Sequence, residues 1–257
     1  MLDVAIFAAL GWEVRAVTQA LSGLEAGDRP GTWHGYLGDG ASCGVVRTGM
    51  GPARAAAAAA AAPPARLYVS SGCAGGVVEW LRAGDLVSAT SVIRLHRDGQ
   101  PAERLAIADV RLTAWAAGRG FRVHAGPLAS TPAILATGGT KADAAATGAL
   151  AVDMESGAIG AAARARGASF LVLRVVLDEA GQELPIDPSL IDDTGEVRVA
   201  RALATSALHP GRWRALVRLG RQRRRAERSL RACLAVVLGG GLDALGLPPS
   251  AAWVATG

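Results

Sequence analysis

The 257-residue sequence is 51% hydrophobic with a formal net charge of +5, and its positive charge is arginine apart from Lys141. This length suits one α/β domain. The sequence contains no run of ~20 apolar residues, so no membrane span is predicted. Three scattered cysteines exclude a disulfide framework or a zinc site and favour a reducing, cytoplasmic compartment. The arginine bias accompanies heavy alanine and glycine usage, which is typical of a GC-rich coding sequence. It is therefore no evidence for nucleic-acid binding, and we do not expect a nucleic-acid partner.

Apolar segments rich in β-branched residues alternate with alanine-rich segments. The first apolar segment, at 4–10, has no basic region before it and is closely followed by Glu13. It is therefore predicted to be a buried strand and not a signal peptide. Continuous apolar runs predict strands at 4–10, 44–49, 66–72, 84–93 and 169–176. Alanine-rich runs predict helices at 52–64 and 156–167. The alternation predicts an α/β fold with a largely parallel sheet, in which ligands bind beyond the carboxyl ends of the strands.

The C-terminal part differs in composition. Residues 182–208 are polar and proline-containing, and nine arginines interleave with apolar residues within 212–231. We therefore expect a core at 1–181 and an arginine-rich helical extension at 182–257, packed on or attached to that core. A basic amphipathic helix can lie on an anionic membrane surface; the alternatives are a solvated helix packed on the core or a nucleic-acid contact.

Two carboxylates flank Met154 in the segment "AVDMESGAIG". One interpretation makes Asp153 and Glu155 capping acids for the helix that follows, where acids interact favourably with the helix dipole. The other makes the preceding apolar run a strand. Residues two apart then share one face, and the paired acceptors suit sugar hydroxyls. Both interpretations stay open at this level.

Other acids and a glycine-rich turn lie at the ends of predicted strands. Glu13 follows the first strand and is either an exposed helix residue or a site residue. Asp178 ends the last predicted strand, a better position for a site, although a helix cap is the alternative. The turn "SSGCAGG" can offer backbone N–H groups to an anion or a sugar. Cys73 within it is read as a small buried residue in preference to a nucleophile.

The order and spacing of these motifs resemble the purine nucleoside phosphorylase/nucleosidase superfamily, especially hydrolases related to methylthioadenosine/S-adenosylhomocysteine nucleosidase. The resemblance runs from Val4 to about Gly181 through "RTGMGPARA", "SSGCAGGV", "TKADAAATGALAVDMES" and "FLVLRVVLDEAG". It implies a single-domain nucleoside phosphorylase/hydrolase-type fold, with a mixed central sheet flanked by helices and a C-terminal helical extension. It also implies an enzyme that cleaves an N-glycosidic bond.

The resemblance implies a role for individual residues. Glu155 matches the acid that binds the ribose hydroxyls, and Met154 lines the sugar. Asp178 matches the acid that protonates purine N7, which requires burial to raise its pKa. Glu13 matches the carboxylate that activates water. The remaining positions that match the walls of the ribose and base pockets are Ala9, Met50, Cys73, Ala74 and Gly75.

Several positions depart from the nucleosidase pattern. Cys73 replaces a serine, and Leu177 replaces a polar residue beside the acid. Pro132 and Ala133 fall where an aromatic residue often stacks on adenine. No cofactor or metal is implied, although phosphate would be a co-substrate if Arg47 or Arg54 served an anion and the reaction were phosphorolytic.

The C-terminal quarter resembles the tail of hopanoid-associated phosphorylase-like proteins, which implies release of adenine from adenosylhopane. The alternatives are a methylthioadenosine/S-adenosylhomocysteine nucleosidase, a phosphate-dependent purine nucleoside phosphorylase, and a non-catalytic adenosine-binding or membrane-associated partner protein. A lipid-linked nucleoside would place the protein in the cytoplasm, peripherally at the inner membrane face through its arginine-rich segment. The resemblance further implies a homo-oligomer.

Overall fold

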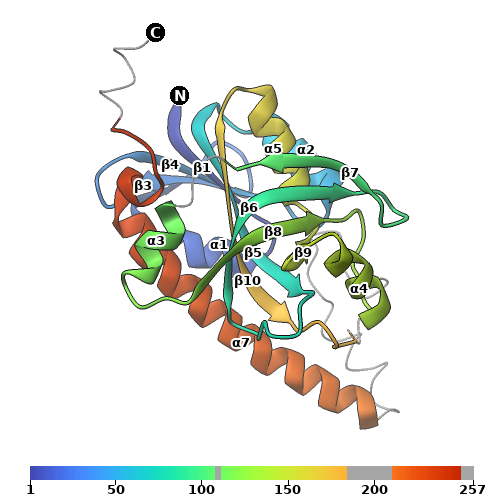
Figure 1. Ribbon diagram of the computed structural model, residues 1–257. Coiled ribbons are helices and arrows are strands. Elements are labelled where there is room, and N and C mark those ends of the chain that lie inside the picture. Colours follow the sequence, from blue (N-terminus) through green and yellow to red (C-terminus); the bar gives the residue numbers. More distant parts are fainter. Residues whose placement is uncertain (108–110, 184–209, 250–257) are drawn as a thin grey trace.

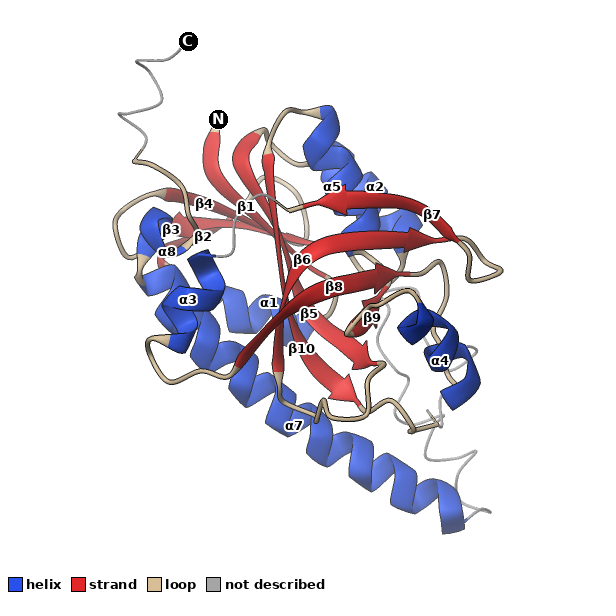
Figure 2. Ribbon diagram, in the orientation of Figure 1, coloured by secondary structure: helices blue, strands red, loops and turns tan. Residues whose placement is uncertain are grey.

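The computed structural model describes residues 1–107, 111–183 and 210–249. A central β-sheet lies between two groups of helices (Figures 1 and 2), so the described chain forms three layers. The expected connection at 182–208 lies almost wholly outside the described residues. The expected α/β fold, with a mixed sheet flanked by helices and a helix near the C-terminus, is confirmed.

The strands are β1 (Leu2–Ala8), β2 (Ser22–Ala26), β3 (Thr32–Tyr36), β4 (Ser42–Arg47), β5 (Ala65–Gly76), β6 (Leu86–Leu95), β7 (Pro101–Ala106), β8 (Val123–Ser130), β9 (Ala151–Asp153) and β10 (Ser169–Asp178). The helices are α1 (Gly11–Thr18), α2 (Pro52–Ala61), α3 (Arg111–Ala117), α4 (Gly138–Ala146), α5 (Ser156–Ala165), α7 (Pro210–Gly239) and α8 (Gly241–Ala244).

The strands form one sheet in the order β10-β6-β8-β9-β5-β1-β4-β3-β2, with β7 beside β6. A further pairing of β10 with β5 closes the β10-β6-β8-β9-β5 part into a ring. β5 runs parallel to β1 and β10, but β2–β3, β3–β4 and β6–β7 are antiparallel. Within the ring, β10–β6 and β5–β9 are antiparallel as well, so the expectation of a largely parallel sheet is wrong and the sheet is mixed. Short turns connect β2 to β3, β3 to β4 and β6 to β7, which forces antiparallel pairing there.

Alternating side chains of β1 supply two separate apolar cores. Val4, Ile6 and Ala8 pack into the core on the α1 and α7 side, whereas Ala5 and Phe7 join the core beneath α2 and α5. This period of two is what a strand buried on both faces produces. Because β5 pairs in parallel with both β1 and β10, the carboxyl ends of these three strands lie side by side.

The long helix α7 packs its C-terminal half against the core. Leu230, Leu234 and Leu238 are buried in the same apolar cluster as β1 and β10. Figure 1 shows the N-terminal half of α7 extending past the carboxyl end of β10. Within the described residues, none of the helices is sufficiently long and apolar to cross a bilayer.

Candidate active site

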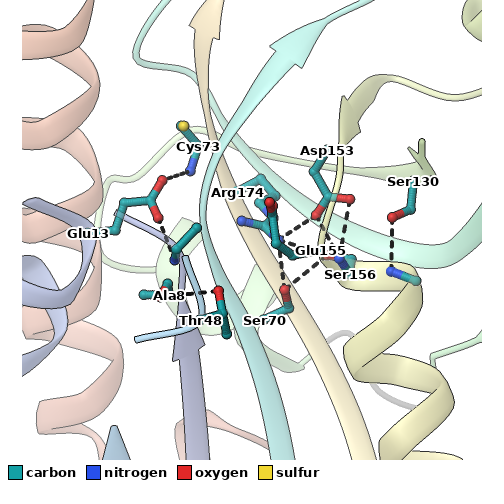
Figure 3. A network of polar contacts seen from close by, with 12 residues as sticks. Ala8, Glu13, Thr48, Ser70, Cys73, Ser130, Asp153, Glu155, Ser156 and Arg174 are labelled. Atoms are coloured by element: carbon teal, nitrogen blue, oxygen red, sulfur yellow. Dashed lines mark hydrogen bonds and ion pairs between the residues drawn. The ribbon is translucent and has the colours of Figure 1, made fainter. Parts of the chain in front are cut away.

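The carboxyl end of β5 holds the carboxylate of Glu13. Its Oε2 accepts hydrogen bonds from the N–H groups of Ala9 and Leu10, both at 2.9 Å. Its Oε1 accepts one from the N–H of Cys73 at 2.8 Å (Figure 3). The side chain is 1% exposed. Glu13 belongs to the first turn of α1, so its carboxylate satisfies amides at the start of its own helix and ties that helix to β5.

Gly72 lies where two charged side chains converge. Its φ of 153° falls in a region that favours glycine. A Cβ atom there would lie 2.7 Å from Arg174 Nη1 and 2.8 Å from the carboxyl carbon of Glu13. The glycine of "SSGCAGG" therefore lets a guanidinium and a carboxylate approach the same strand.

Arg174 is the centre of the buried polar network in Figure 3. Its side chain, in the middle of β10, pairs with Asp153 and lies 3.9 Å from Glu155 Oε2. Its Nη2 also donates to the hydroxyls of Ser70 (2.7 Å) and Ser156 (3.0 Å). A fully buried arginine is stable only with such partners.

The two acids of "AVDMESGAIG" have different surroundings. β9 ends at Asp153, whose carboxylate accepts the N–H of Ser156 at 3.1 Å and thus caps α5. Glu155 is the residue before α5 but makes no capping bond; its Oε1 accepts the N–H of Gly51 at 2.7 Å. The capping interpretation therefore holds for Asp153, and Glu155 instead faces the loop after β4. The two acids do not share a strand face.

Burial and neighbouring acids act on the protonation of Glu155. Burial raises its pKa to about 7, and the carboxylate of Asp153 adds to this, while Arg174 and the Gly51 N–H oppose it. Burial, with Glu13 beside it, raises the pKa of Cys73 well above its usual value. A raised pKa favours the neutral thiol, which disfavours a nucleophile; Cys73 is half-buried, however, and not fully buried as expected.

Asp178 lies at the carboxyl end of β10, 4% exposed, beside Gly75 of β5. A Cβ atom on Gly75 would lie 3.2 Å from Asp178 Oδ2, so a small residue there permits this approach. The ammonium of Lys141, on α4, contacts the same oxygen. Burial raises the pKa of Asp178, and Lys141 opposes the rise.

The structure gathers the other expected site residues around these acids. Ala9 and Ala74 are buried, and Met50, Cys73, Gly75 and Met154 are half-buried. The methyl carbon of Met154 would be 3.7 Å from a Cβ on Gly51, the residue that binds Glu155. The carboxyl groups of Glu13 and Asp178 lie against Gly72 and Gly75 of β5. These two glycines are three residues apart, which is about 10 Å along an extended strand. Of the positions that depart from the pattern, Pro132 and Ala133 are exposed, and Leu177 is half-buried.

Two buried cations were not among the expected site residues. Arg174 interrupts the apolar run "FLVLRVVL", and a lone arginine in a predicted core strand is a signal that a buried acid pairs with it. Lys141 is the only lysine in an arginine-rich chain. Their partners could not be read from the sequence. Among the described residues, no cluster of three His, Cys, Asp or Glu side chains could hold a metal ion.

Known structures resemble this fold. The methylthioadenosine/S-adenosylhomocysteine nucleosidase of Colwellia psychrerythraea, in complex with adenine, is 25% identical, with a TM-score of 0.63 over 72% of this chain and 85% of that one. That of Neisseria meningitidis, in complex with methylthio-immucillin-A, is 18% identical, with a TM-score of 0.71 over 93% of this chain and 100% of that one. A search of curated protein sequences finds no match.

The family model described as the phosphorylase superfamily matches residues 3–208, most of the chain. The superfamily inferred from "SSGCAGGV", "VDMES" and the strand ending in Asp178 is confirmed, as is the likeness to the nucleosidase structures. The chain belongs to the phosphorylase superfamily, and the expectation of an enzyme that acts on N-glycosidic bonds is confirmed with it.

Proposed function

We propose that this protein is a nucleosidase that hydrolyses the N-glycosidic bond of a 5′-substituted adenosine and releases adenine. The observation that carries the proposal is the set of three buried carboxylates, Glu13, Glu155 and Asp178, around the carboxyl end of β5. The likeness to the nucleosidase of C. psychrerythraea, solved with adenine, supports the choice of base.

The mechanism assigns one step to each carboxylate. Asp178 donates a proton to purine N7 as the bond between C1′ and N9 breaks, and its raised pKa favours the protonated form that this step requires. Glu13 takes a proton from the water that attacks C1′. Its Oε1 accepts only one of the three N–H bonds, so this oxygen retains acceptor capacity for that water. Glu155 accepts hydrogen bonds from the ribose hydroxyls, and Met154 and Met50 line the sugar.

The surroundings of Glu13 favour water over phosphate as the nucleophile. The N–H groups of Ala9, Leu10 and Cys73 converge as an anion site would, but the carboxylate of Glu13 already accepts all three. A phosphate would have to displace that carboxylate and would be repelled by it. Of the two arginines considered for phosphate, Arg54 is exposed on α2. The phosphorolytic alternative therefore has weaker support.

For the 5′ substituent we propose a hopanoid lipid. The substrate would then be adenosylhopane, and the reaction would be a step of hopanoid biosynthesis. The resemblance of the C-terminal quarter suggested this substrate, and the position of α7 supports it. Gln222 of α7 exchanges two amide hydrogen bonds, of 3.1 and 2.8 Å, with Gln182, four residues after Asp178. This part of α7 therefore lies near the proposed acid. Gln222 is on its core-facing side with the buried Ala226 and Leu230, and the arginines are on its exposed side.

We propose that the exposed, arginine-bearing side of this part of α7 contacts an anionic membrane surface. Arg221, Arg224 and Arg228 are exposed on it, and Arg225 lies against Gly84, four residues from Trp80. Trp80 is 53% exposed, and tryptophan is typical of the interface between lipid headgroups and water. From the family resemblance we also propose that the protein assembles as a homo-oligomer. From the resemblance and the composition we propose a catalytic core at 1–181 and a helical extension at 182–257.

The test incubates purified protein with methylthioadenosine, S-adenosylhomocysteine, inosine and vesicle-bound adenosylhopane, each with and without phosphate. We expect free adenine and a free sugar without phosphate, and the highest kcat/KM for adenosylhopane. A phosphate requirement would identify a phosphorylase, and no base release from any substrate would refute a catalytic role.

The membrane contact has its own measurement. The protein should sediment with phosphatidylglycerol vesicles and not with phosphatidylcholine vesicles. Replacing Arg221, Arg224 and Arg228 by glutamine should abolish sedimentation while methylthioadenosine turnover is kept. Equal sedimentation of this variant and the wild type would contradict the proposed contact.

A further inference from the structure

Lys141 is a buried ammonium group with three acceptors. It is 1% exposed, on α4, and its Nζ contacts Asp178 Oδ2 and donates to the carbonyls of Glu179 (2.8 Å) and Gln182 (3.4 Å). An ammonium has three N–H donors, so these acceptors match the charged form. The side chain ties α4 to the end of β10, 37 residues further along the chain.

The start of α4 fixes the lysine in this place. Thr137 caps the helix by accepting the N–H of Thr140 at 3.3 Å, and the N–H of Lys141 donates to the Thr137 carbonyl at 3.2 Å. The chain then enters β9 and the "VDMES" segment. The helix that carries Lys141 therefore leads along the chain into the segment that carries Glu155.

The pairing meets a specific demand of the proposed reaction. A carboxyl group that donates its proton in a buried place leaves a carboxylate without water around it, which is unfavourable. The ammonium at Oδ2 offsets that charge where it forms. Lys141 contacts Oδ2, and no other side chain in the described part of the chain bonds the carboxyl group, so Oδ1 is available to carry the proton toward the substrate.

We propose that Lys141 is a positioning residue that orients Asp178 and stabilises the carboxylate left when Asp178 protonates the purine. This inference rests on the proposed function. In the step, the proton passes from Asp178 to N7, the bond between C1′ and N9 breaks, and its electron pair stays with the purine. Lys141 keeps its own proton throughout and does not touch the substrate.

Other charged groups near Asp178 are engaged elsewhere. Glu179, the next residue, accepts the N–H of Ala83 at 3.3 Å. Asp153 and Glu155, from the β9–α5 junction, interact with Arg174, and β5 presents Gly75, which is not titratable. Among the described residues, Lys141 is the charged side chain that contacts Asp178.

The first test measures the pH dependence of kcat for adenine release in the wild type, Lys141→Met and Lys141→Arg. Activity requires protonated Asp178, so it is lost as pH rises through the pKa of that group. The ammonium of Lys141 lowers the pKa of Asp178, so its removal should raise that pKa. The alkaline limb of the kcat–pH profile of Lys141→Met should therefore move up by more than about one pH unit. Its kcat at pH 7 should fall about 10- to 100-fold with KM changed less than about threefold. Lys141→Arg should restore the limb and part of kcat.

A matched control loosens the same segment without touching Asp178. Gln222→Ala removes the amide pair with Gln182 and should leave the limb in place. The proposal would be overturned if Lys141→Met lost kcat without a shift of the alkaline limb, or if Gln222→Ala lost kcat equally. Either result would mean that Lys141 only holds α4 against the end of β10. Absence of adenine release by the wild type would instead refute the proposed function itself.

The second test needs no lysine variant to fold. Because Lys141 is the only lysine, untagged protein labelled with ¹⁵N-lysine gives a single side-chain NMR signal. That signal should be an ammonium at pH 7 and should show an inflection at the pH of the alkaline limb of kcat. The inflection should vanish in Asp178→Asn. A neutral amine at pH 7, or an inflection that persists in this variant, would contradict the pairing.

Discussion

Replacing Glu155 by glutamine should stabilise the fold at alkaline pH. The side chain is 6% exposed, and burial together with Asp153 raises its pKa from 4.5 to about 7. Below pH 4.5 the group is neutral in both the folded and the unfolded chain. As pH rises to about 7, the unfolded chain gives up this proton more readily, so the free energy of unfolding falls; above that it stays constant.

The size of this effect follows from the same interval. One pKa unit corresponds to about 1.4 kcal/mol, so the interval from 4.5 to about 7 is worth on the order of 3 kcal/mol at pH 8. Glutamine keeps an oxygen for the N–H of Gly51, but its amide N–H would face Arg174, which lowers the gain to about 2 kcal/mol. For a chain of this length that is a rise in Tm of about 4–8 °C.

Thermal unfolding of the wild type and Glu155→Gln at pH 5 and pH 8 measures the effect. The Tm gain should be present at pH 8 and mostly absent at pH 5, where Glu155 is protonated in the fold. Glu103→Gln is the control, because its pairs with Arg94 and Arg164 lower its pKa and predict a small loss of stability at pH 8. An equal gain at both pH values, or no gain at pH 8, would refute the assigned protonation. Adenine release should be impaired in Glu155→Gln despite its greater stability.

Two further predictions concern the network around Gly72. Glu13→Gln should lower the rate of hydrolysis by about 10²–10⁴-fold, measured as adenine released without phosphate; activity regained on adding phosphate would support phosphorolysis instead. Arg174→Met should lower the free energy of unfolding by about 3–5 kcal/mol in urea titrations, because it leaves the carboxylate of Asp153 buried and unpaired. Its double variant with Asp153→Asn should recover part of that loss, and no recovery would mean that the pair is not what stabilises this region.

The sequence predicted the buried part of the fold better than its periphery. β1, β4, β5, β6 and β10 were expected within a few residues of their bounds, because strands buried on both faces are continuous apolar runs. β2 was not, because all its residues are exposed and the segment lacks any apolar pattern. β8 was missed because a glycine and a proline interrupt it.

The candidate site was predictable in part. Glu13 and Asp178 follow predicted strands, so their position at one edge of the sheet is a consequence of its topology. For Glu155 the preceding strand was only one of two interpretations. The two interpretations of "AVDMESGAIG" could not be separated, because the outcome depends on β9 ending at Asp153 and on Arg174 reaching it from β10. The same applies to Lys141, whose contact with Asp178 depends on how α4 packs.

The most direct test of the account compares adenine release from methylthioadenosine by the wild type and by Asp178→Asn in phosphate-free buffer. The asparagine variant keeps the size of the side chain but has no proton to donate to N7. The account predicts adenine release by the wild type, a loss of at least about 10²-fold in kcat for the variant, and cooperative unfolding of both proteins. Equal kcat in the two proteins would remove Asp178 from the mechanism, and adenine release only with phosphate would contradict hydrolysis.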